Sequence, residues 1–122
     1  MEESEINSML NEARYLHNYL EKEDEAIKIC DKILEHDPNN RDALLIKIGS
    51  LNLIGKEKEA SHLIQEAINK WPEHWEAYYL LGLELFNINE KMAVDFFKKS
   101  IALESNFDNN ITLAQLLYFT NP

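Results

Sequence analysis

The sequence predicts an all-α fold built from antiparallel helix pairs. The 122 residues include only three glycines and three prolines, too few for the tight turns of a small all-β protein. Apolar residues make up 45% and charged residues 28%, which is typical of a globular chain. Apolar positions also recur at helical spacing, and the helical stretches themselves repeat along the chain.

The sequence repeats with a period of 34 residues. Pro38 and Pro72 are separated by this step, and alanines repeat at nearly the same step as Ala26, Ala60 and Ala93. Larger apolar residues keep these steps in further ladders: Cys30, Ile64 and Phe97; Leu34, Ile68 and Ile101; and Leu10, Leu44, Tyr78 and Ile111. A period of this length predicts stacked helix pairs that bury their apolar faces against one another.

We expect one domain spanning residues 1–122, with about seven helices. The repeats cover about 7–40, 41–74 and 75–107, and a C-terminal helix covers about 108–120. In the first repeat, the ladder residues place one helix around Leu10 and a second around Cys30. Pro38 then ends the second helix, and Asn39, Asn40 or Asp42 caps the next helix.

The second repeat shows both of its helices clearly. Leu44, Ile48 and Leu51 form an apolar stripe, and Gly55 is suited to the left-handed residue that often follows a helix. A second stripe follows the turn, from Ala60 to Trp71. The third repeat has one residue fewer, which we place in the turn FNINEKM.

These positions resemble the tetratricopeptide repeat (TPR) family over residues 7–107. The family has characteristic residues at the fourth, eighth, eleventh, twentieth, twenty-fourth, twenty-seventh and thirty-second places of each repeat. The second repeat holds there Leu44, Ile48, Leu51, Ala60, Ile64, Ala67 and Pro72. The third holds Tyr78, Gly82, Leu85, Ala93, Phe97, Ser100 and Ser105, and the first holds Leu10, Arg14, His17, Ala26, Cys30, Ile33 and Pro38.

The resemblance implies a right-handed superhelix whose first helices line a concave groove. It also implies a peptide-binding surface on those helices. The corresponding residues are Asn11, Tyr15, Asn18 and Tyr19; Leu45, Gly49 and Asn52; and Tyr79, Leu83 and Phe86. Such an aromatic lining with asparagines suits a peptide or helix of a protein partner.

TPR proteins that grip the C-terminal carboxylate of heat-shock chaperones do so with lysines, an arginine and asparagines. The matching places here hold Asn11, Tyr15, Ile46, Glu76 and Leu80, with no cation among them. We therefore do not expect a carboxylate clamp.

A non-catalytic protein-interaction module is the function that the sequence favours. One alternative is a small chaperone of the secretion type, which would escort an apolar protein segment. Another is a structural protein that self-associates through its apolar C-terminal helix, giving a homodimer. That helix would use Leu113, Leu116, Leu117 and Phe119, or it would begin a longer repeat array.

Charge and composition narrow the partners. With 22 acidic and 12 basic residues, the net charge of −10 opposes binding to nucleic acid or to an anionic membrane, and favours a basic or apolar protein segment. The N-terminus lacks the features of a signal peptide, and no apolar run is long enough to span a bilayer. The lone Cys30 fits a reducing compartment, so a cytoplasmic location is expected.

No catalytic, metal-binding or cofactor motif is recognisable. The glycines are scattered, and no HExxH, CxxC or GxSxG pattern occurs. The pairs His17/Glu21 and His62/Glu66 have helical spacing for a metal, but His17 occupies a core position of the repeat. We expect neither an enzyme nor a metal or cofactor site.

Overall fold

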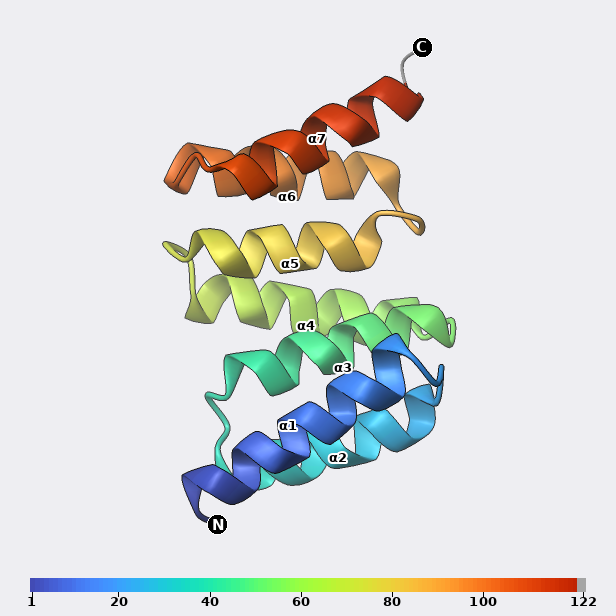
Figure 1. Cartoon of the computed structure of the whole chain (residues 1–122), viewed down its shortest axis with the longest axis vertical. Helices are drawn as coiled ribbons and strands as arrows, with labels where there is room; N and C mark the ends of the chain where they lie inside the picture. Colours follow the sequence, from blue (N-terminus) through green and yellow to red (C-terminus); the bar gives the residue numbers. More distant parts are fainter. Residues whose placement is uncertain (121–122) are drawn as a thin grey trace. The chain divides into compact units, whose positions relative to one another are not determined.

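The computed structural model describes residues 1–120, with side chains described up to Tyr118, and the described part is all-α as predicted. Its seven helices are α1 (Glu3–Asn18), α2 (Glu23–His36), α3 (Arg41–Leu53), α4 (Glu57–Lys70), α5 (Trp75–Leu85), α6 (Glu90–Leu103) and α7 (Phe107–Thr120) (Figure 1). They follow the expected order of three helix pairs and a C-terminal helix. α1 begins at Glu3, about one turn before the predicted first repeat.

Local signals explain several helix ends. The Asn40 side chain accepts a hydrogen bond from the Ala43 backbone N–H at 3.0 Å, so the predicted cap of α3 is confirmed. Asn89 caps α6 in the same way, at 3.1 Å from the Met92 nitrogen. Gly55 has φ of +84°, the left-handed conformation predicted after α3. Glu21, one repeat earlier, takes the same conformation with φ of +53°.

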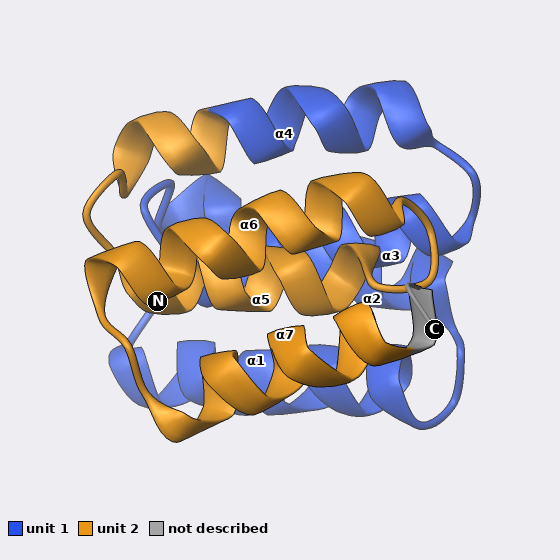
Figure 2. Cartoon of the chain, turned by 90° about the horizontal axis from the view of Figure 1, so that it is seen from above, with its two compact units in different colours: residues 1–65 blue, residues 66–122 orange. Residues whose placement is uncertain are grey.

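The helices form two compact units, which we describe separately. The first comprises residues 1–65 and the second begins at Glu66, so the boundary lies inside α4 (Figure 2). The prediction of one domain stays a prediction.

The first unit packs α1, α2 and α3 against one another. One cluster of its core holds six buried residues, with Ile6, Met9, Ile29 and Leu34 packed against them; the six are Leu10, Ala13, Cys30, Ile33, Ala43 and Ile46. Small residues at Ala13 and Ala43 allow helix backbones to approach closely, while the larger ones fill the remaining space.

The second unit packs α5 against α6, and α6 against α7. A methyl group at Gly82 would lie 2.6 Å from a ring carbon of Phe97, so only glycine permits this approach of α5 to α6. Asn109, fully buried at the start of α7, donates to the Ser100 hydroxyl at 3.1 Å and to the Glu104 carbonyl at 2.8 Å. These bonds attach α7 to the C-terminal end of α6.

Candidate functional site

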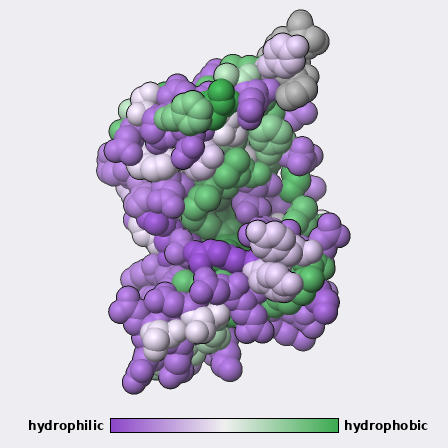
Figure 3. Space-filling model, in the orientation of Figure 1, coloured by the Kyte–Doolittle hydropathy of each residue, from purple (hydrophilic) through white to green (hydrophobic). Residues whose placement is uncertain are grey.

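The exposed face of α1 contains the first group of predicted binding residues. Asn11 and Asn18 are exposed, and the rings of Tyr15 and Tyr19 are 54% and 75% exposed. The two ring centroids lie 5.6 Å apart with a tilt of 38°. Figure 3 shows pale side chains near the C-terminal end of α1, with hydrophobic and hydrophilic side chains beside them. α1 therefore presents two adjacent aromatic rings to solvent.

The residues predicted on α3 do not form an open surface, which corrects the sequence-based expectation. Leu45 is 4% and Asn52 is 8% exposed, and Gly49 is buried. Every residue from Ala43 to Asn52 except Lys47 is buried. A helix that is apolar on nearly all sides is normally enclosed by its neighbours, and this signal was present in the sequence RDALLIKIGSLNL.

The residues predicted on α5 are only partly accessible. Leu83 is 40% exposed, while Tyr79 and Phe86 are half-buried. The Tyr79 ring contacts Trp75 and Phe97 at centroid distances of 6.0 Å, and its hydroxyl lies 3.5 Å from that of Thr112 in α7. Phe86 packs edge-on against Phe97 at 6.5 Å. Much of the aromatic area expected for binding is therefore used in packing within the second unit.

The expected self-association residues of α7 also need correction. Leu116 is 2% exposed, so it belongs to the core and cannot contact another molecule. Leu113 and Leu117 are half-buried. The side chain of Phe119 lies outside the described residues. The exposed residues of α7 are different ones, because α6 and α5 cover the face that carries Leu116 and Thr112.

A buried polar cluster connects the three helices of the first unit. His17 of α1, Glu23 of α2 and Ser50 of α3 are 8%, 6% and 0% exposed. The His17 Nδ1 atom lies 2.6 Å from Glu23 Oε1 and 3.2 Å from Ser50 Oγ, and Ser50 donates to the same carboxylate oxygen at 2.8 Å. Because a carboxylate only accepts, the Nδ1–H of His17 is the donor to Glu23.

This cluster has the residue types of a hydrolytic triad but a different geometry. In a triad the hydroxyl and the carboxylate contact opposite nitrogens of the imidazole, which lets the ring take the hydroxyl proton. Here both contact Nδ1, and all three side chains are inaccessible to a substrate. The core position of His17 was predicted. Its partners were not, because Glu23 resembles the exposed Glu57 and Glu90 one and two repeats later.

Solved structures with this arrangement of helices carry TPR domains. MamA (residues 41 to the end) from Desulfovibrio magneticus RS-1 matches at 22% identity and a TM-score of 0.65, covering 95% of this chain and 66% of that one. The first TPR of Spaghetti (RPAP3), bound to the HSP90 peptide SRMEEVD, matches at 18% and 0.68, covering 100% and 98%. A chain of the Naa15/Naa10 complex bound to HypK-THB matches at 21% and 0.77, covering 96% and 18%.

The chain has a TPR-like fold. It spans about two thirds of the MamA chain and less than a fifth of the chain from the Naa15/Naa10 complex. No family model matches the sequence, and no curated protein matches it. The likeness to TPR domains is therefore found by comparing structures, and not by comparing whole sequences.

The TPR positions account for much of the packing seen above. Ala26, Ala60 and Ala93, at the twentieth place of each repeat, are completely buried. Cys30 and Phe97, at the twenty-fourth place, are also completely buried, and burial raises the pKa of the Cys30 thiol to about 12. Tyr78, at the fourth place, donates its hydroxyl to the Pro72 carbonyl at 3.1 Å, and burial raises its pKa.

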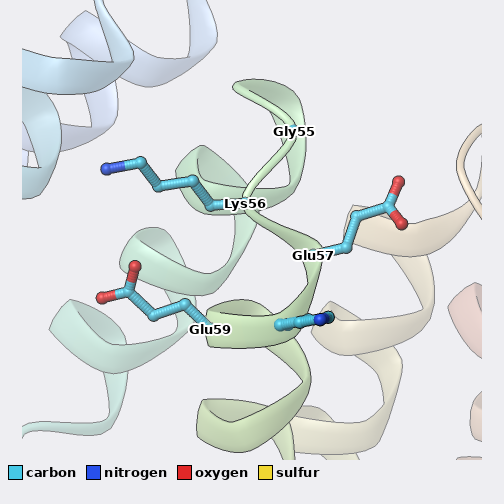
Figure 4. Close-up of a pocket in the computed structure, with 5 residues that line it drawn as sticks. Gly55, Lys56, Glu57 and Glu59 are labelled. Carbon is cyan, nitrogen blue, oxygen red and sulfur yellow. The ribbon is translucent and has the colours of Figure 1, made fainter.

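Two surface hollows lie in the first unit of the TPR-like chain. One, of about 460 Å³, is lined by residues 55–59, and Figure 4 shows Lys56 and Glu57 of this lining pointing in different directions. The other, of about 320 Å³, lies beside Ile54 and is lined by residues 21–25, among them Glu21, Asp24 and Glu25. The second combines the apolar Ile54 with four acidic residues and Lys22.

Two classes of feature are absent from the described residues. Within residues 1–120, no set of three histidine, cysteine, aspartate or glutamate side chains is placed to hold a metal ion. None of the helices described in that range is both long and apolar enough to span a bilayer.

Proposed function

We propose that this protein is a non-catalytic protein-interaction module that binds an apolar, basic segment of a protein partner. The observation that carries the proposal is the exposed ring pair of Tyr15 on α1 and Tyr19 directly after α1, with Asn11 and Asn18 on the same helix as Tyr15. Tyrosine supplies a large contact area at a small cost in side-chain entropy, and asparagine can pair with the backbone of an extended peptide.

The charge of the neighbouring surface supports a basic partner. The hollow beside Ile54 begins just after the end of α1, and its lining contains four acidic residues and one cation, Lys22. Leu20 and Leu53, also exposed, add apolar area within the same unit. A net charge of −10 attracts a cationic segment and repels an acidic one.

On α5, exposed Leu83 and the half-buried rings of Tyr79 and Phe86 would supply a second contact surface in the second unit. The TPR of Spaghetti (RPAP3) is bound to an acidic peptide, but the clamp positions of this chain hold no cation. We therefore propose that the protein prefers a basic ligand, opposite in charge to that peptide.

A panel of labelled peptides tests this function. The peptides share one apolar stripe and carry either lysines or glutamates at their polar positions. We expect the lysine peptides to bind in fluorescence anisotropy and the glutamate peptides, with SRMEEVD, not to bind. In the double variant Tyr15→Ser/Tyr19→Ser, the affinity should fall about tenfold or more, since buried aromatic residues often dominate binding energy.

The matched control is Ile88→Ser/Met92→Ser, which removes two exposed apolar residues from the second unit. It should retain the affinity of the wild-type protein. Equal losses in the two double variants would show that general hydrophobicity, and not the ring pair, governs binding. Preference for the glutamate peptides would overturn the proposed partner charge.

A further inference from the structure

The outer face of α7 is apolar and exposed. Phe107, Ile111 and Tyr118 are 78%, 41% and 73% exposed, and Ala114 is exposed as well. With 3.6 residues per turn, these four residues fall within about 60° of the helix circumference. Figure 3 shows hydrophobic and pale side chains over this helix. The face lies opposite buried Leu116, so it differs from the surface that the sequence suggested.

The repeat register explains why such residues occur there. Ile111 continues the ladder of Leu10, Leu44 and Tyr78, which are 5%, 3% and 4% exposed. The Tyr78 ring lies 6.2 Å from that of Phe96 in α6, so this ladder position faces the helix that follows. Among residues 1–120 no helix follows α7, and the corresponding face is open to solvent.

The four residues are arranged symmetrically along the helix. Phe107 and Tyr118 lie equally far from the midpoint between Thr112 and Leu113, and so do Ile111 and Ala114. If two α7 helices pack antiparallel across a twofold axis, each Phe107 meets Tyr118 of the other copy, and Ile111 interdigitates with the small Ala114. We propose that the outer face of α7 is a self-association surface that pairs with α7 of a second copy of this chain.

The low charge of α7 permits this occupant. Two copies of a chain with net charge −10 repel one another, but α7 contains a single charged residue, Asp108. In the antiparallel arrangement the two Asp108 side chains are nine residues apart along the axis, about 13.5 Å. That separation exceeds the screening length of about 8 Å in physiological salt, so their repulsion is small.

The exposed area predicts a weak dimer. Aromatic side chains bury about 150–250 Å² each when covered, so the four residues and their flanks would bury on the order of 1,000 Å² over both copies. Specific interfaces of this size are at the low end of the known range, and dissociation constants in the micromolar range are expected.

Sedimentation equilibrium from about 1 μM to 1 mM tests the proposal on the full chain. The mass should rise from 14.3 kDa toward that of a dimer. Ala114→Arg, which brings two cations and extra bulk near the twofold axis, should keep the protein monomeric over this range. Ala102→Arg changes another exposed alanine, on α6, and should associate like the wild-type protein.

Phe107→Ala provides a second variant without a charge change. Because Phe107 is 78% exposed, its removal should leave the fold intact by circular dichroism while raising the dissociation constant about tenfold or more. A monomeric wild-type protein at 1 mM would overturn the proposal. So would association that Ala114→Arg and Phe107→Ala leave unchanged, because another surface would then be responsible. Either result leaves the proposed ring-pair site on α1 untouched, since it uses other residues.

Discussion

Glu21 adopts a backbone conformation that is unfavourable for a residue with a side chain. It has φ of +53° in the turn between α1 and α2, where a side chain costs about 1 kcal/mol relative to glycine. The equivalent turn of the second repeat uses Gly55, with φ of +84°. We predict that Glu21→Gly raises the free energy of unfolding by about 0.5–1 kcal/mol, measured by urea denaturation.

The reverse change, Gly55→Ala, provides the control. A methyl group at Gly55 would meet no atom within 4 Å, so any effect comes from the backbone alone. It should lower the free energy of unfolding by a similar amount. A loss of stability in Glu21→Gly would show that the glutamate side chain contributes more than its backbone strain costs.

Cys30 should be chemically inert in the folded protein. Burial and the nearby Asp31 raise the pKa of its thiol from 9.0 to about 12, which removes the reactive thiolate at neutral pH. We predict that a disulfide reagent labels Cys30 at pH 8 only as fast as the protein unfolds, with full labelling in urea. Rapid labelling of the native protein would contradict this burial.

The same shift predicts the sign of a pH effect. The unfolded thiol loses its proton from about pH 9 and the folded one only near pH 12, so the stabilising contribution is complete below pH 9 and is lost as the pH rises toward 12. The stability difference between the wild-type protein and Cys30→Ala should therefore shrink above pH 9. A difference that stays constant to pH 11 would count against the raised pKa.

At the level of helix pairs, Gly82 sets the approach of α5 to α6. Replacing glycine by alanine inside a helix normally stabilises it by about 1 kcal/mol. At Gly82 the new methyl group would lie 2.6 Å from the buried Phe97 ring, so we predict a net loss of about 1–3 kcal/mol. Calorimetry of the single and double variants with Phe97→Leu should show strong coupling, and simple additivity would argue against this contact.

Ser50 connects α3 to the pair formed by His17 and Glu23. Its hydroxyl donates to Glu23 Oε1, while Glu23 Oε2 is buried and accepts no hydrogen bond from the described residues. Ser50→Ala removes one of the few donors to this carboxylate, and we predict a loss of about 1–3 kcal/mol in urea denaturation. Ser61→Ala, at an exposed position of α4, should be close to neutral. Equal effects of the two substitutions would contradict a role for the cluster in stability.

For the whole molecule, the excess of 22 acidic over 12 basic residues has opposite effects on folding and on binding. Salt screens the repulsion within the chain, so the thermal midpoint should rise as sodium chloride increases from about 20 to 300 mM. Binding of a lysine peptide should weaken over the same range. If the thermal midpoint and the peptide affinity both rose or both fell with salt, net charge would not govern partner choice.

Features that depend on nearby residues were predictable. The ladder of Leu10, Leu44 and Tyr78 is buried as the repeat requires, and Asn40 and Gly55 mark the ends that their side chains or conformations favour. The binding surface was predicted less well. Tyr15 and Tyr19 are exposed, but Leu45 and Asn52 are enclosed because neighbouring helices cover α3 on more than one side.

The helix order, the 34-residue period and the core alanines follow from the sequence alone. Helical periodicity and capping depend on residues only a few positions apart, and the same pattern recurs in each repeat. The buried contact of His17, Glu23 and Ser50 and the exposed face of α7 became visible only in the folded chain. Both depend on which helices lie next to one another. Whether a side chain is buried depends on neighbours that are distant in sequence, and the pattern within one helix does not identify those neighbours.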